Sequence, residues 1–493
     1  MDAGLPTATV PHVTRYPETF LPDSRRVLLR PFIPDDPRRV AGIIGRVMSL
    51  DENQTAALLD MVFAEFQERH TQLEHVFERH YALVRPHLFS DTEPTAARRL
   101  LLGSYFTAEY ALESAALFNP SIVPHPDQDG LSPDWLRFVM SFRATGEGHI
   151  SSIEFRTGYI SALGEILVER PERFVTDAEV VPNPSYEKVC FERRLVEMGF
   201  DTPTARNVLA NLGDEFTLST LRQAVNEDAL CGQPNRQDEE RTRDAMVWLA
   251  ESNYEIRFRE EVPLSERVIF PYSTNESNGI EDARFVRFIE DDGQVAYYAT
   301  YTAYNGRFIL PQLLSTRDFL TFRIATLNGG AVQNKGLALF PRRVNGRYAM
   351  ISRQDNESLF LMYSDNLHFW HDMQKIARPT YAWEFVQIGN CGSPIETRQG
   401  WLLLTHGVGP MRKYCISALL LDLHDPSRIV GRLRAPLLAP NENEREGYVP
   451  NVVYTCGAVL HKDRLVIPYA MADKASGLCS VALDELLCHL VPA

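Results

Sequence analysis

Residues 284–304 read RFVRFIEDDGQVAYYATYTAY, two apolar runs separated by a short acidic segment that contains Asp292-Gly293. Valine, isoleucine, tyrosine and phenylalanine are frequent in both runs, as is typical of β-strands. An Asp-Gly pair favours the tight turns whose twist matches the two strands of a hairpin. The stretch therefore predicts an antiparallel hairpin.

The same layout recurs along the chain. Comparable turns are expected at Asn345-Gly346, Gln399-Gly400 and Lys462-Asp463, and a related unit surrounds Gly130. The turn glycines at 293, 346 and 400 are 53 and 54 residues apart, and the next turn follows about 63 residues later. Five units with a period near 50 residues predict a mostly β protein and, within that class, a five-bladed β-propeller. The alternative is a β-sandwich with helical decorations.

Two segments interrupt this pattern with helical periodicity. Residues 56–84 carry apolar side chains at three- and four-residue spacing, and Asp51 is a suitable N-cap. Residues 95–118 predict a second helix, ended by Asn119-Pro120. We therefore expect an N-terminal α-helical extension over residues 1–117 and a propeller domain over 118–490. A helical insertion at about 185–260 is expected between blades 1 and 2.

Composition narrows the class of protein. The 493 residues carry a net charge of −15, which argues against a nucleic-acid partner. Seven cysteines without a CxxC pair favour a reducing compartment and no structural zinc site. Neither a leader peptide nor a membrane-spanning run is evident, so we expect a cytoplasmic protein without a membrane partner. The helical regions are candidate contacts for a homo-oligomer.

Polar residues embedded in apolar strand context are the candidates for chemistry, because a propeller brings its inner strands to one axis. Glu281 and Asp282 adjoin an arginine, which fits either a general acid or a surface ion pair. Lys335 and Arg353 flank a hairpin and suit an anion such as phosphate, although single basic residues are usually solvent-exposed. Further candidates of this kind are Asn119, Ser121, Arg143, His406, Tyr414 and Asp473.

These segments, taken in order, resemble glycoside hydrolase family 130. The matching motifs include GIEDAR (279–284), YTAY (301–304), NKGLALFP (334–341), GWLLLTHGV (400–408) and YAMAD (469–473). The resemblance covers roughly residues 117–175 and 270–490 and implies a five-bladed propeller. It also implies inverting cleavage of β-mannosides, in most members by inorganic phosphate to give α-mannose 1-phosphate and in some by water.

The resemblance implies a role for each matching residue. Asp282 is the expected catalytic acid, acting through the O3 hydroxyl of the mannose. The expected phosphate-binding residues are Arg143, Lys335, Arg353, Gln387, His406 and Tyr414. The expected substrate-binding residues are Asn119, Ser121, Glu281, Tyr304 and Asp473. No metal or cofactor is expected; inorganic phosphate is a co-substrate, and a β-manno-oligosaccharide is the other.

Two positions depart from the family pattern. Gln387 stands where many members have a phosphate-site lysine, and Ala283 replaces a proline. Neither Gln387 nor His406 is the glutamate found in the family's hydrolases, which favours phosphorolysis. A β-1,2-mannosidase and a non-catalytic sugar-binding propeller remain the alternatives, and the sequence leaves open the linkage, the +1 sugar and the physiological direction.

Overall fold

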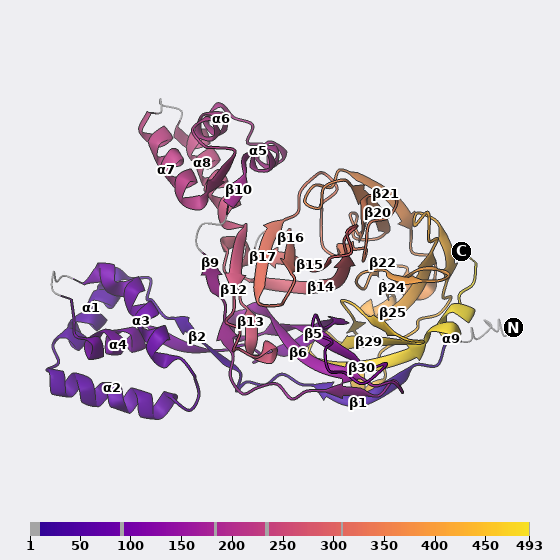
Figure 1. Ribbon diagram of the computed structural model, residues 1–493, viewed down its shortest axis with the longest axis horizontal. Coiled ribbons are helices and arrows are strands. Elements are labelled where there is room, and N and C mark those ends of the chain that lie inside the picture. The colour runs from indigo at the N-terminus through magenta and orange to yellow at the C-terminus, as the bar shows by residue number, and fades with distance from the viewer. Residues whose placement is uncertain (1–9, 89–92, 182–184, 232–235, 307–308, 493) are drawn as a thin grey trace. The chain divides into compact units, whose positions relative to one another are not determined.

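The computed structural model describes residues 10–88, 93–181, 185–231, 236–306 and 309–492. Strands dominate it, and the longer helices lie in two segments, residues 37–105 and 188–251 (Figure 1). The mostly β class predicted from the repeated hairpins is confirmed. Among the described residues, no helix is both long and apolar enough to cross a bilayer.

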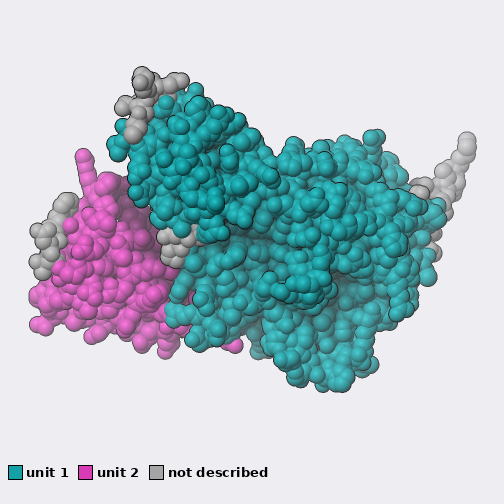
Figure 2. Space-filling view, turned by 45° about the horizontal axis from the view of Figure 1, so that its top comes forward, with its two compact units in different colours: residues 1–22, 115–171, 177–493 teal, residues 23–114, 172–176 magenta. Residues whose placement is uncertain are grey.

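Five sheets of at least four strands form most of the larger of two compact units, residues 1–22, 115–171 and 177–493 (Figure 2). The first sheet has the order β4-β5-β6-β13-β8, with β7 beside β6: β4 (Ala116–Pro124), β5 (Leu136–Thr145), β6 (Ser151–Ile160), β7 (Ile166–Val168), β8 (Thr176–Asp177) and β13 (Arg267–Ile269). The second has the order β14-β15-β16-β17-β12-β9: β9 (Glu179–Val181), β12 (Tyr254–Arg257), β14 (Gly279–Ile289), β15 (Val295–Tyr304), β16 (Ile309–Thr316) and β17 (Thr321–Thr326).

The other three sheets follow in chain order. The third is β18 (Ala338–Leu339), β19 (Tyr348–Ser352), β20 (Leu359–Ser364) and β21 (Asp372–Ala377). The fourth is β22 (Gln387–Asn390), β24 (Gly400–Val408), β25 (Tyr414–Leu421) and β26 (Ile429–Arg432), with β23 (Ile395–Thr397) beside β24. The fifth is β27 (Val453–Tyr454), β29 (Arg464–Met471), β30 (Ala475–Ala482) and β1 (Thr14–Phe20), with β28 (Val459–His461) beside β29.

Each sheet contacts the next one along the chain. β4 contacts β14, β15 contacts β18, β19 contacts β22, and β25 contacts β27. β29 of the fifth sheet contacts β4 of the first, so the sheets form a circuit of neighbours. The fifth sheet is completed from the other end of the chain, because β1 pairs antiparallel with β30. This pairing was not foreseen, since the segment TRYPETF has no regular apolar alternation.

The turn residues lie where the hairpins were expected, with one small shift. Asn345 and Gly346 both have positive φ (52° and 77°), as a tight hairpin turn requires. Gly293 (φ 82°) lies in the turn between β14 and β15. In the fourth sheet, Thr397 pairs with Gly400, so the turn is centred one residue earlier than predicted.

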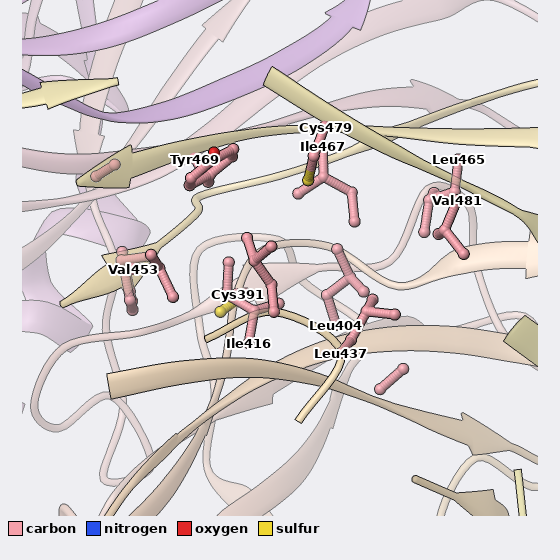
Figure 3. Close-up of a cluster of buried hydrophobic side chains, with 14 of the residues drawn as sticks. Cys391, Leu404, Ile416, Leu437, Val453, Leu465, Ile467, Tyr469, Cys479 and Val481 are labelled. Atoms are coloured by element: carbon pink, nitrogen blue, oxygen red, sulfur yellow. The ribbon is translucent and has the colours of Figure 1, made fainter. Parts of the chain in front are cut away.

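Alternating side chains of adjacent sheets build the core. Leu404 of β24, Ile416 of β25, Ile467 of β29 and Val481 of β30 belong to one buried cluster (Figure 3). Residues two apart on these strands, such as Leu465 and Ile467, enter the same cluster, because successive side chains of a strand point to opposite faces.

The smaller compact unit comprises residues 23–114 and 172–176. It contains β2 (Val27–Pro31), β3 (Thr107–Ala111), α1 (Pro37–Met48), α2 (Glu52–Phe66), α3 (Leu73–Val84) and α4 (Ala96–Tyr105). Asp51 caps α2 as predicted, in a reciprocal arrangement with Gln54.

Two helix predictions in this region were too long. The helix expected over residues 56–84 is divided between α2 and α3, and the one expected over 95–118 ends at Tyr105. Beyond Tyr105, residues 107–111 pair with β2 and residues 116–124 form β4, so strand pairing with distant residues overrides the local helical spacing.

A helical segment of the larger unit lies between β9 and β12, which both belong to the second sheet. It comprises α5 (Lys188–Glu197), α6 (Pro203–Ala210), α7 (Leu218–Cys231) and α8 (Arg236–Glu251), with a small ribbon of β10 (Ser185–Glu187) and β11 (Glu215–Thr217). Its helices pack on a core of their own that includes Phe191, Leu221 and Met246. A short helix, α9 (Leu483–Cys488), follows β30.

Candidate active site

Asp282 lies at a bulge in β14. Glu281 pairs with Thr302 and Arg284 with Thr300, so the two residues between them oppose a single residue of β15. Asp282 has φ 57°, a left-handed conformation that Asp and Asn adopt more readily than other residues with side chains. Bulges redirect side chains and are frequent beside active sites.

Asn119 occupies a matching irregularity in β4 of the first sheet. The register of β4 shifts between Phe118 and Ser121, and Asn119 has φ 47°. Its Nδ2 donates a hydrogen bond to Oδ1 of Asp282 at 2.7 Å. The two bulges therefore bring together an amide donor and a carboxylate that are 163 positions apart in the chain.

Cationic side chains surround this carboxylate. Arg143 of β5 has Nη1 at 3.4 Å from Oδ1 of Asp282 and Nη2 at 2.9 Å from Oε1 of Glu281. Lys335 Nζ lies 2.5 Å from the other oxygen of Glu281. Arg284 donates to the backbone oxygen of Asp282 (3.2 Å) and to Tyr454 Oη (2.6 Å).

The charges decide the protonation state of Asp282. Burial alone would raise its pKa, but Arg143, Arg284, Lys335 and the amide of Asn119 favour the charged form and lower the pKa overall. The free protein therefore holds Asp282 ionised at neutral pH. An anion that neutralised these cations would raise the pKa of Asp282 and favour its protonation.

A second group of polar side chains comes from the third and fourth sheets. Arg353 Nη1 lies 3.1 Å from Nε2 of His406. The amide of Gln387, turned so that its nitrogen donates to the carbonyl of Asn356 at 3.1 Å, directs its oxygen to both Arg353 and His406. The His406 ring stacks on Tyr414 at 5.7 Å between ring centres.

His406 contributes no positive charge in the free protein. Burial and the nearby charges of Arg353 and Arg284 lower its pKa well below the usual value, so the imidazole is neutral at pH 7. Arg353 therefore supplies the charge of this group, and Gln387 and His406 supply dipoles.

A cavity of about 340 Å³ lies beside the Asp282 bulge. Four of the predicted residues line it, Arg143, Glu281, Tyr304 and Asp473, together with His149 and Tyr448, which the sequence analysis did not assign. A cavity of this size suits a small polar ligand such as a sugar. An acid surrounded by cations beside such a cavity can deliver a proton to a bound molecule while an anion is held nearby.

The other eight predicted residues do not line this cavity: Asn119, Asp282, Lys335, Arg353, Gln387, His406, Tyr414 and Ser121. One of them, Ser121, is fully buried, and its hydroxyl accepts a hydrogen bond from the backbone amide of Phe285 at 3.2 Å. Its side chain therefore joins the first sheet to the second, next to the two bulges.

Three buried polar residues of the site, Arg284, Tyr454 and Asn390, were not among the predicted site residues. Arg284 and Tyr454 bond each other, and the side-chain amide of Asn390 has no hydrogen-bond partner among the described residues. Buried amides without partners are uncommon, so Asn390 is a candidate ligand-binding group. Arg284 and Asn390 could have been noticed in the sequence, because GIEDAR and GNCG place polar residues within apolar strands.

Asp473→Asn should stabilise the protein at neutral pH. Burial and the charge of Asp282 raise the pKa of Asp473 to about 6, whereas an unfolded aspartate titrates near about 3.9. The folded state binds this proton more tightly, so Asp473 lowers stability progressively as pH rises from about 4 to about 6. After a discount for partial exposure, we expect a gain of about 1 kcal/mol at pH 7 and none at pH 3.5, measured by urea unfolding. Equal effects at both pH values would contradict the raised pKa.

Comparison with known proteins places the amino-acid sequence in a family. The glycoside hydrolase family 130 description, beta-1,4-mannooligosaccharide phosphorylase, matches residues 235–491, more than half of the chain. A 1,2-beta-oligomannan phosphorylase of Thermoanaerobacter sp. (strain X514) is 33% identical over 235 residues, 45% of this chain and 75% of that protein. A beta-1,2-mannobiose phosphorylase of Listeria innocua serovar 6a is 29% identical over 230 residues, 45% of this chain and 63% of that protein.

Among solved structures, the Listeria innocua beta-1,2-mannobiose phosphorylase in complex with beta-1,2-mannobiose matches with a TM-score of 0.45 and 21% identity. That match covers 76% of this chain and 92% of the other. The family match over more than half of the sequence is the decisive finding. The chain belongs to glycoside hydrolase family 130.

Proposed function

We propose that this protein is an inverting phosphorylase that cleaves β-mannosides with inorganic phosphate and releases α-mannose 1-phosphate. One observation carries the proposal: the partly buried carboxylate of Asp282 lies among Arg143, Arg284 and Lys335, of which Arg143 and Lys335 come from distant parts of the chain. The relatives named as mannoside phosphorylases support the same activity.

The proposed scaffold is a five-bladed propeller over residues 118–490, interrupted by the helical insertion at about 185–260. The circuit of contacts among the five sheets supports this architecture. In such a propeller the first strands of the sheets surround a central axis. Asn119 and Asp282 lie on two of these strands, β4 and β14.

In the proposed reaction, an oxygen of phosphate attacks C1 of the mannose as the bond from C1 to the glycosidic oxygen breaks. The proton of Asp282 passes through the O3 hydroxyl of the mannose to the departing oxygen, which leaves as an alcohol. Inversion needs the acid and the nucleophile on opposite faces of the sugar. Phosphate is already an anion and needs no general base, unlike water.

The same cations also explain when Asp282 would gain its proton. Arg143 and Lys335 are engaged by Glu281 in the free protein, and their charges keep Asp282 ionised. A bound phosphate would share these cations and raise the pKa of Asp282. Protonation of the acid would then accompany binding of the nucleophile, and solvent would return the proton after turnover.

A β-mannosidase is the second candidate, and Asp473 favours it. This carboxylate lines the cavity, and its pKa near 6 would suit a base that activates water. The phosphorylase is preferred because positions 387 and 406 carry an amide and a neutral imidazole in contact with Arg353.

A product assay separates the two. The protein would be incubated with β-1,2-, β-1,3- and β-1,4-linked mannosides, each with and without phosphate. Mannose 1-phosphate formed only with phosphate would support the phosphorylase. Free mannose formed at equal rates in both arms would overturn it in favour of the hydrolase, and the linkage turned over fastest would identify the substrate class.

Gln387→Lys should lower the KM for phosphate by about 5-fold, because it adds a charged donor next to Arg353. Initial rates at saturating mannoside and varied phosphate would measure this. Gln374→Lys on an exposed position of β21 adds the same charge elsewhere and should leave KM unchanged. A raised KM in Gln387→Lys alone would mean that Gln387 does not face the phosphate.

A further inference from the structure

A second cavity, here called the insertion pocket, lies between the helical insertion and the strands of the second sheet. Its volume is about 500 Å³, and it shares no lining residue with the cavity beside Asp282. Among the residues that line it are Tyr186, Phe191, Arg194, Tyr254, Tyr298 and His368. Aromatic rings with a few polar groups in a cavity of this size are typical of a small-molecule site.

Arg194 of α5 is the unusual member of this lining. Only 6% of its surface is exposed, and its Nη1 donates to the carbonyl oxygen of Thr326 at 3.3 Å. Its Nε has no hydrogen-bond partner among the described residues. Burial lowers the pKa of Arg194 to about 9 although the charge of Glu197 raises it, so the protein compensates this buried charge only in part.

The carboxylates near Arg194 are engaged elsewhere. Glu197 accepts a hydrogen bond from the backbone amide of Gly329 (2.8 Å) and lies 3.4 Å from His371. Glu255 pairs with Arg323 at 2.7 Å, and Glu187 is exposed and accepts from the thiol of Cys190. A buried arginine without a paired carboxylate destabilises the fold, so an external anion would relieve a real penalty.

His368 adds a second polar group to the same cavity. Its Nδ1 is buried and has no hydrogen-bond partner among the described residues. Arg194 and His368 both line the insertion pocket. Burial and the charge of Arg194 lower the pKa of His368, against the opposing charge of Glu187. A neutral imidazole beside a guanidinium offers a donor that would complement the oxygens of an anion.

We propose that the insertion pocket binds a small organic anion, a carboxylate or a phosphate monoester carried on a compact ring. The anionic oxygens bond Arg194 and His368, and the ring lies among Tyr186, Phe191 and Tyr254. This site is independent of the proposed catalytic reaction, because no residue of the Asp282 cavity takes part.

Calorimetry with three probes of similar shape tests the chemistry. Phenyl phosphate and benzoate should bind the full chain saturably with one ligand per chain, and neutral benzyl alcohol should bind at least 10-fold more weakly. Stronger binding by one of the two anions would distinguish a phosphate site from a carboxylate site. Absence of saturable binding by both anions, or equal binding of benzyl alcohol, would overturn the proposal.

Variants of Arg194 and of an exposed neighbouring arginine test whether the anion binds in the insertion pocket. Arg194→Met should weaken the anion by about 10- to 100-fold, the effect of losing charged hydrogen bonds. Arg193→Met removes the same charge from an exposed neighbour on α5 that does not line the pocket, and should leave binding unchanged. Binding that survives Arg194→Met but is lost in Arg353→Ala would assign the anion to the catalytic site and overturn the proposal.

The melting temperature distinguishes an arginine that binds a ligand from one that only supports the fold. Arg194→Met should raise the melting temperature without ligand, because it replaces a buried unpaired charge by an apolar side chain. It should also abolish the rise in melting temperature that phenyl phosphate produces in the parent protein. A lower melting temperature in Arg194→Met would mean that Arg194 is a structural residue.

His368→Phe provides a second binding test that does not depend on the folding of Arg194→Met. It keeps an aromatic ring, removes Nδ1, and should weaken the binding of phenyl phosphate. Unchanged binding would count against the site.

Discussion

Asp282→Asn should lower kcat for phosphorolysis by about three orders of magnitude, because it removes the proton donor and little else. Asparagine has nearly the same shape and tolerates the left-handed backbone that Asp282 adopts (φ 57°). The surrounding cations should therefore keep their places. Release of mannose 1-phosphate from β-mannobiose would measure the rate, and calorimetry would check that the mannoside still binds.

Asp473→Asn is the matched control for that experiment. It replaces a second aspartate with positive φ (52°), one that lines the cavity beside the Asp282 bulge. If Asp473 only holds the sugar, its loss should raise the KM for the mannoside more than it lowers kcat. Residual turnover in Asp282→Asn together with complete loss in Asp473→Asn would exchange the two roles, and the raised pKa of Asp473 would then explain why it is the acid.

Arg353→Ala should raise the KM for phosphate by about 10- to 100-fold with a smaller change in kcat. The guanidinium is the charged member of the group formed with His406 and Gln387, and a charged hydrogen bond contributes about 1.5–3 kcal/mol. Rates at varied phosphate and saturating mannoside would measure this.

Two variants control for charge and position. Arg353→Lys keeps the charge without the planar fork and should recover part of the loss. Arg342→Ala removes an arginine that pairs with Glu396 at the surface (2.6 Å, 40% exposed), and should leave the KM for phosphate unaltered. An unchanged phosphate dependence in Arg353→Ala would exclude Arg353 from the phosphate site.

The candidate site illustrates which properties local sequence can reveal. GIEDAR, NKGLALFP and GWLLLTHGV contain Asp282, Lys335 and His406, and the order of these motifs was enough to suggest the family. Their ionisation could not be read in the same way. His406 is neutral because it is buried beside Arg353 and Arg284, which are 53 and 122 positions away from it in the chain.

The burial of other side chains could not be read from the local sequence either. The resemblance implies a sugar-binding role for Ser121, and the structure adds a hydrogen bond to its hydroxyl from the backbone amide of Phe285 in the next sheet. Arg194 lies in the predicted helical insertion and is buried against the second sheet. Neither outcome is encoded within a few residues of the side chain, because burial depends on what packs against it.

The amino-acid order alone was sufficient for the β class, for the hairpin turns and for the first turn of α2. These depend on side-chain alternation, on residues that accept positive φ and on a capping aspartate, all of which act over fewer than about ten residues. Folding decided the pairing of β1 with β30, the end of α4 at Tyr105 and the meeting of Asn119 with Asp282. Each of these joins segments far apart in the chain, where pairing, burial and charge outweigh local preference.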